Sequence, residues 1–169
     1  MLSSFQKKRT IVVVSLITLS LLVGVACRGA ASGKKFGTFR EDGRLVFFDD
    51  AGAVRVAIVI ELAATPAEKR KGLMGRHKMD DTVGMLFVYD RAADRVFWMR
   101  NTSISLDILF ISEDRKVINI ASHTVPDTEK RYRSTAPAMY VVEVVSGFCE
   151  RYGIKQGTHL NWQLMEVLR

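Results

Sequence analysis

The sequence predicts a mainly β fold: a compact antiparallel β-barrel or a jelly-roll-like sandwich, with one short helix near residues 66–74. Short apolar segments rich in β-branched residues follow one another, separated by brief turns. They include only one clear helix pattern, whereas a doubly wound parallel sheet needs helices between its strands. The 169 residues, 48% of them hydrophobic, are enough for the core of one domain.

The domain begins with two predicted strands and the helix. Residues 45–48 form a short apolar strand, and residues 49–52 supply turn-forming side chains. Apolar residues then recur at every second position over residues 54–62, which is typical of a strand. Thr65, Pro66 and Glu68 make a helix start, with a hydroxyl cap, a proline in the first turn and a glutamate three residues after the cap. Gly75 is expected to end this helix.

The rest of the domain consists of further short strands. A tight turn at residues 113–115 is expected to join two of them. The strands are predicted at residues 85–89, 95–99, 106–111, 116–120, 140–145 and 160–167. Residues 44–169 are therefore interpreted as a single β-rich domain.

The N-terminal segment is typical of export. Residues 1–26 combine a basic start with an apolar run from Ile11 to Ala26, which predicts a secretory signal peptide. Small residues before Cys27 resemble a lipobox, so Cys27 is the predicted lipidation site. Cleavage near residues 29–31 and an uncleaved membrane anchor are the alternatives. Residues 27–43 are predicted to be a glycine- and serine-containing tether.

Charge and cysteine content exclude several classes of protein. Loss of residues 1–26 lowers the formal charge from +7 to +4, and the remaining cations lie among acids without a basic aromatic run, so no nucleic-acid partner is expected. Two cysteines cannot form a four-thiolate zinc site. His77, His123 and His159 lack ligand spacing, so no metal or cofactor is expected. Cys149 is interpreted as a core thiol.

A series of short motifs in the domain resembles a known family. The motifs are Glu61-Leu62-Ala63, Thr65-Pro66, Gly72-Leu73-Met74, Gly84-Met85-Leu86-Phe87-Val88, Phe97-Trp98-Met99, Asn101-Thr102, Leu106-Asp107-Ile108, Pro137-Ala138 and Tyr140-Val141-Val142-Glu143. Over residues 54–168 the chain is similar to the bacterial and archaeal family called domain of unknown function 192. Ser105 and Thr158 depart from its pattern, which usually has proline and aspartate there. The resemblance implies a compact β-domain, often secreted or membrane-tethered, and no established reaction, cofactor or catalytic residue.

Two carboxylates stand out because they interrupt apolar strands. Asp107 shares a predicted strand face with Leu109 and Ile111, and Glu143 lies between valines. A buried carboxylate is costly unless it is paired or hydrogen-bonded. Such a group acts as an acid or base, grips a ligand, or forms a structural ion pair. The structural alternatives are a pair with Arg76, Arg95 or Arg100, and a sheet edge that faces water.

Two functional hypotheses follow. In the first, the protein is an exported binding module of the bacterial envelope that faces the periplasm or exterior. The module is attached to the membrane through the N-terminal lipid or anchor, and its ligand is a small molecule, a glycan or an envelope protein. The candidate pocket residues are Arg76, Asn101, Thr102, Asp107 and Glu143, although Asn101 and Thr102 are equally suited to closing a turn. In the second hypothesis, a small hydrolase or lyase uses Asp107 and Glu143 as an acid–base pair.

Overall fold

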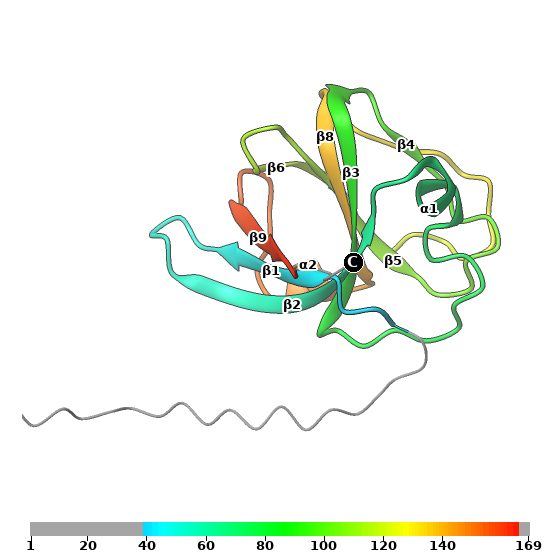
Figure 1. Ribbon diagram of the computed structural model, residues 1–169, viewed down its shortest axis with the longest axis horizontal. Coiled ribbons are helices and arrows are strands. Elements are labelled where there is room, and N and C mark those ends of the chain that lie inside the picture. The colour runs from blue at the N-terminus through cyan, green and yellow to red at the C-terminus, as the bar shows by residue number, and fades with distance from the viewer. Residues whose placement is uncertain (1–38, 166–169) are drawn as a thin grey trace, which may run out of the picture. The chain divides into compact units, whose positions relative to one another are not determined.

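The computed structural model describes residues 39–165, so the predicted signal peptide, Cys27 and most of the predicted tether lie outside the described residues. The fold is mainly β, as predicted (Figure 1). The strands are β1 (Gly43–Phe48), β2 (Val54–Ala63), β3 (Val83–Ala93), β4 (Val96–Phe97), β5 (Leu106–Ile111), β6 (Val117–Ala121), β7 (Tyr132–Arg133), β8 (Ala138–Val145) and β9 (Leu160–Leu164). The helices are α1 (Pro66–Lys71) and α2 (Phe148–Arg151).

Seven strands form one sheet in the order β6-β5-β8-β3-β2-β1-β9, and β4 pairs with β7 in a small second sheet. Neighbours in the large sheet are antiparallel except β2 and β3, which are parallel. The sheet is therefore antiparallel, as expected, except at this one pair. The segment containing α1 provides the crossover connection that two parallel strands require.

The two ends of the large sheet approach each other without forming a continuous closed barrel among the described strands. Lys116 and His159 form an isolated β-bridge, and the Val117 N–H donates to the Thr158 carbonyl at 3.0 Å. This contact lies between the start of β6 and the segment that leads into β9. The architecture is consequently a curled, sandwich-like sheet.

The core is divided into two clusters by the large sheet. Alternate residues of a strand point to opposite faces, and the central strands supply both clusters. Leu86 and Val142 belong to the first cluster, whereas Phe87 and Val141 belong to the second. All six residues of β5 are buried, as expected for a central strand covered on both faces.

The predicted helix start is confirmed. Thr65 Oγ1 accepts a hydrogen bond from the Glu68 N–H at 3.2 Å, and the Glu68 carboxylate accepts one from the Thr65 N–H at 2.9 Å. The helix ends at Lys71, earlier than predicted, because Gly72 adopts a left-handed φ of 47° and turns the chain. The chain therefore turns toward the sheet one helical turn before Gly75.

The last residues of the predicted tether are part of the domain. The Arg40 N–H donates to Glu61 Oε1 at 2.6 Å, and the Leu62 N–H donates to Asp42 Oδ2 at 2.8 Å. These bonds attach the segment before β1 to the end of β2. Within residues 39–165, no helix combines the length and the apolar character needed to span a membrane.

Candidate functional site

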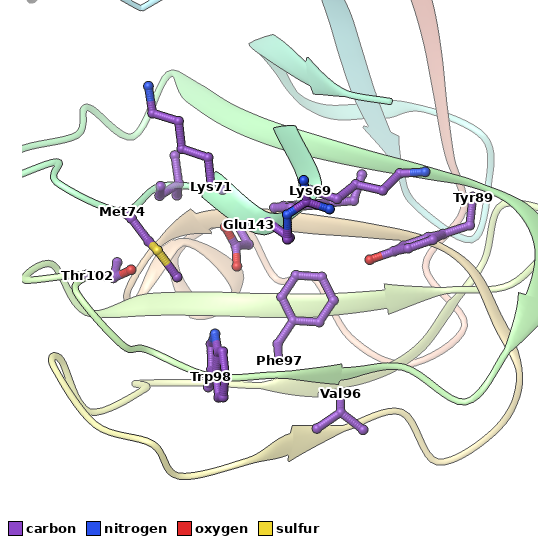
Figure 2. A pocket seen from close by; sticks show the side chains of 13 residues that line it. Lys69, Lys71, Met74, Tyr89, Val96, Phe97, Trp98, Thr102 and Glu143 are labelled. Atoms are coloured by element: carbon purple, nitrogen blue, oxygen red, sulfur yellow. The ribbon is translucent and has the colours of Figure 1, made fainter. Parts of the chain in front are cut away.

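A cavity of about 370 Å³ lies between the end of α1, strands β3, β4 and β8, and the turn after β4 (Figure 2). The second core cluster lies next to it, since Leu73 and Phe87 belong to both. Its lining consists of Lys69, Arg70, Lys71, Gly72, Leu73, Met74, Phe87, Tyr89, Val96, Phe97, Trp98, Thr102 and Glu143. Segments that are far apart in the sequence therefore line the same cavity.

Glu143 is the acidic side chain of this lining. Its neighbours directly across the sheet are Met85 on β3 and Ile108 on β5, both apolar and buried. The residue is 5% exposed, and its Oε2 atom has no hydrogen-bond partner. It is the one buried side-chain oxygen or nitrogen without a partner in the described part of the chain. Burial raises the pKa of Glu143 to about 8, so the carboxyl is mostly protonated at neutral pH.

Gly72 brings the backbone close to this carboxyl. A Cβ atom at position 72 would lie 3.4 Å from the ring of Phe87 and 4.0 Å from Glu143 Oε2. The left-handed φ of 47° also disfavours a side chain there. The backbone conformation therefore favours a glycine, whereas a Cβ atom would make only ordinary van der Waals contacts and would occupy space beside the carboxyl group.

Aromatic side chains form much of the cavity wall. Phe87 and Phe97 pack edge to face, with ring centroids 5.0 Å apart. The ring of Tyr89 is approached by two cations, with Arg95 Cζ at 3.6 Å and Lys69 Nζ at 4.5 Å from its centroid. Burial raises the pKa of Tyr89, and the nearby Arg95 opposes that rise. Trp98 is 45% exposed, so its ring is accessible to solvent.

Three consecutive cations border the cavity. Lys69, Arg70 and Lys71 occupy the last turn of α1, where positive side chains also interact favourably with the negative end of the helix. Arg70 and Lys71 are exposed to solvent. The site thus combines a buried carboxyl, aromatic walls and a basic border.

Two of the five predicted pocket residues, Thr102 and Glu143, lie in this cavity; Arg76, Asn101 and Asp107 are absent from its lining. Thr102 is 5% exposed. Asn101 lies in a turn with φ of 54°, and its carbonyl accepts a hydrogen bond from the Gly75 N–H at 2.9 Å. Thr102 lines the cavity and also closes the turn, since its N–H donates to the Met99 carbonyl at 3.1 Å.

Arg76 has a buried partner elsewhere. Its Nη2 atom lies 2.7 Å from Oε1 and 2.5 Å from Oε2 of Glu61, which is 3% exposed. The guanidinium of Arg76 also lies over the ring of Phe39, 4.9 Å from its centroid. This pair attaches the turn after α1 to strand β2.

Asp107 has a structural role, and the predicted pairing of Asp107 with Glu143 is wrong. Its two carboxylate oxygens accept hydrogen bonds from the N–H groups of His123 and Cys149, each at 3.0 Å. Asp107 is directly opposite Val144, whereas Glu143 is directly opposite Ile108. Directly opposite residues share a face, so the two carboxyl groups lie on opposite faces of the sheet. No cleft on one face can present both to one substrate.

The predicted ion pairs of these carboxylates are not formed either. Asp107 is held by backbone N–H groups, and Glu143 makes no ion pair among the described residues. Arg95 instead donates to the Ala138 carbonyl at 3.0 Å, and Arg100 lies 3.9 Å from Glu129 at the surface.

The remaining nucleophile candidates do not form a catalytic arrangement. Burial, followed by the charge of Asp107, raises the pKa of the Cys149 thiol far above its ordinary value. Ser146 Oγ lies 2.7 Å from His123 Nδ1, but the opposite ring nitrogen is 3.8 Å from Glu150, too far for a hydrogen bond. The side chains of His123 and Glu150 are 61% and 83% exposed. Within residues 39–165, no group of three or more His, Cys, Asp or Glu side chains is arranged to hold a metal ion.

Sequence reasoning missed most of the cavity wall. The sequence pattern predicts only a helix at residues 69–72, and it does not place Trp98 in a pocket. The adjacent aromatic residues Phe97 and Trp98 were the available signal. Neighbouring residues of a strand point to opposite faces, so one of two such large rings is expected to leave the core, and in the structure that ring is Trp98.

Comparison with known proteins identifies the family. The model of the DUF192 family, described as "Uncharacterized ACR", matches residues 47–162. The chain belongs to the DUF192 family. The family resemblance of the motifs is thereby confirmed, and it includes Gly72, Phe97, Trp98, Thr102 and Glu143 of the cavity.

Two solved structures are similar to this DUF192 chain. A protein of unknown function from Novosphingobium aromaticivorans is 39% identical, with a TM-score of 0.67 over 70% of this chain and 84% of that one. A candidate transcription regulator from Sinorhizobium meliloti is 32% identical, with a TM-score of 0.68 over 71% of this chain and 92% of that one. No curated protein matches the chain.

Proposed function

We propose that this protein is a binding module of the bacterial cell envelope whose cavity at Glu143 takes a small organic molecule. The observation that carries the proposal is the buried carboxyl of Glu143, whose Oε2 atom has no partner among residues 39–165. Leaving a buried polar atom without a hydrogen bond is unfavourable, and such atoms concentrate where a protein binds or transforms a ligand.

The size and lining of the cavity support a small-molecule ligand. Its volume of about 370 Å³ falls in the range of roughly 300–1,000 Å³ that is typical of ligand pockets. Seven of its thirteen lining residues are apolar or aromatic and four are charged, so the site offers both an apolar wall and polar groups that can orient a ligand. Binding is favoured over acid–base turnover because Asp107, the carboxylate expected to pair with Glu143, lies on the other face of the sheet.

A thermal-shift screen of purified residues 28–169 tests the cavity. A broad panel of envelope glycans, peptides and metabolites is added to the wild type, to Glu143→Gln and to the exposed control Glu150→Gln. At least one compound should raise the melting temperature of the wild type and the control, with a smaller rise for Glu143→Gln. If no compound stabilises the wild type, the cavity is not a ligand site.

The proposed location rests on the N-terminal sequence. The basic start, the apolar run and Cys27 support export followed by lipidation. Mass spectrometry of the mature protein from bacterial membranes should find a lipid-modified Cys27 at the N-terminus, and Cys27→Ser should release the protein from the membrane fraction. A mature chain that begins at Ser32 would contradict the lipid anchor.

A further inference from the structure

The inner part of the cavity has the chemistry of a cation site. Among the described residues, one oxygen of the Glu143 carboxyl has no partner, and the rings of Phe87 and Phe97 line the same cavity. Figure 2 shows Phe97 near Glu143. A carboxylate attracts a cation by its charge, and aromatic faces attract one through the ring quadrupole. The thioether of Met74 adds an apolar contact surface. A cationic ligand group would give Glu143 the partner that the folded chain does not provide.

The aromatic part of the lining favours a methylated ammonium over a primary one. A primary ammonium is a compact, strongly hydrated charge, so placing it against aromatic rings is costly. A trimethylammonium group requires no hydrogen bond and is recognised by aromatic rings. It therefore fits the part of the wall that Phe87, Phe97 and Trp98 form.

The border of the cavity is basic and favours a negatively charged ligand group. Lys69, Arg70 and Lys71 would repel a ligand that carries only a positive charge. The same three side chains would attract a carboxylate or phosphate group. A ligand that matches both regions therefore carries a cation at one end and an anion at the other.

We propose that the cavity binds a zwitterion whose methylated ammonium group lies against Glu143 and whose carboxylate or phosphate group lies at Lys69, Arg70 and Lys71. This inference rests on the proposed function, since it names the ligand class of the same cavity. Glycine betaine, phosphocholine and the headgroup of phosphatidylcholine share this chemistry. Free solutes and membrane lipids are therefore two sources of one ligand group.

The ligand class predicts a particular pH dependence. The charged and titratable groups that face Glu143 or its cavity are Lys69, Arg70 and Lys71 from α1, Tyr89 from β3, and Arg95, whose guanidinium lies over the Tyr89 ring. Burial raises the pKa of Glu143 to about 8, whereas a trimethylammonium group does not titrate. Binding of the cation must release the proton of Glu143, so affinity should rise about tenfold per pH unit up to pH 8 and then level off.

Isothermal titration calorimetry of residues 28–169 tests the proposal with matched ligands. Glycine betaine and phosphocholine are compared with 3,3-dimethylbutyrate and 3,3-dimethylbutyl phosphate, which replace the ammonium nitrogen by carbon, and with choline, which lacks the anion. Vesicles of phosphatidylcholine form a separate arm, with vesicles of phosphatidylglycerol as the control. Glu143→Gln, Lys69→Met/Lys71→Met and the exposed control Glu150→Gln are measured in parallel. Glu143→Gln is expected to fold, since an amide of the same shape removes a buried ionisable group.

The expected result is binding of at least one zwitterion to the wild type and to Glu150→Gln, weakened at least about tenfold by loss of the ammonium charge or by Glu143→Gln. Binding of the free zwitterion indicates a soluble ligand, and binding of the phosphatidylcholine vesicles alone indicates a lipid headgroup; either supports the proposal. Tighter binding of a carbon isostere, or an affinity that falls above pH 8, overturns it and leaves the proposed function intact. The absence of any ligand in the broader thermal screen overturns both.

Discussion

Asp107 and Glu143 lie on neighbouring strands of one sheet, but their carboxyl groups emerge on opposite faces. Both oxygens of Asp107 accept backbone hydrogen bonds, whereas Glu143 Oε2 has no partner and the residue lines a cavity. The two acidic side chains therefore have different surroundings, which one position of strand register decides. Asp107 connects segments of the fold through hydrogen bonds, and Glu143 lines the proposed ligand cavity.

Glu143→Gln should remove a pH-dependent loss of stability. The folded-state pKa of about 8 exceeds the ordinary value of 4.5, so the folded state holds its proton more tightly than the unfolded state. The wild type should therefore lose stability as the pH rises from about 4.5 to 8, by up to about 5 kcal/mol. Urea unfolding at pH 5, 7 and 9 should show that Glu143→Gln matches the wild type at pH 5 and exceeds it at pH 9. Parallel pH profiles for the two proteins would contradict this account.

Asp107→Ala should destabilise the fold without acting on the cavity. The substitution leaves the partly buried N–H group of His123 and the buried N–H group of Cys149 without their acceptor, and hydrogen bonds to a charged group contribute about 1.5–3 kcal/mol each. We expect a loss of at least about 3 kcal/mol in urea unfolding. Glu113→Ala, at an exposed turn, serves as the control and should stay within about 0.5 kcal/mol of the wild type. An unchanged unfolding midpoint for Asp107→Ala would refute the structural role.

Gly72→Ala and Gly75→Ala should separate backbone strain from loss of cavity space. Both glycines have a positive φ, 47° and 77°, so each alanine should cost about 1–2 kcal/mol. A Cβ at position 72 meets Phe87 and Glu143, whereas one at position 75 meets no atom within 4 Å. Calorimetry should therefore show weaker ligand binding for Gly72→Ala and wild-type affinity for Gly75→Ala. Equal affinities for the two variants would argue against the placement of the ligand beside Gly72.

Arg76 and Glu61 should be strongly coupled. Arg76→Met leaves the buried carboxylate of Glu61 without its charged partner and should cost about 3 kcal/mol, although the Arg40 N–H still donates to Glu61. The double variant Glu61→Gln/Arg76→Met removes both charges and should regain most of that loss. A double-mutant cycle in urea measures the coupling, and additive single effects would show that the pair contributes nothing.

Much of the fold was predictable because its strands carry strong local patterns. The period-two pattern of β2 and the capping box around Thr65 are local signals, and both correspond to observed elements. Strand β7 was missed because its two residues, Tyr132 and Arg133, are too few to form a pattern. The parallel pairing of β2 with β3 was missed because strand direction depends on how a connection crosses the sheet.

The candidate site was only partly predictable for a similar reason. Glu143 was recognisable because a carboxylate in an apolar strand is unusual in itself. Period two also placed Asp107 and Glu143 correctly within their own strands, but the faces of two strands can be compared only when their register is known. Arg76 was misassigned because its partner, Glu61, lies on a strand whose pairing the sequence does not reveal.

The pairing of β1 with β9 joins the first strand of the described domain to its last described strand. During synthesis, the outer edge of β1 therefore stays uncovered until residues 160–164 have left the ribosome. An uncovered edge presents free N–H and C=O groups that pair readily with other chains. Truncation before Leu160 should consequently promote aggregation, since β9 covers the outer edge of β1 in the folded domain.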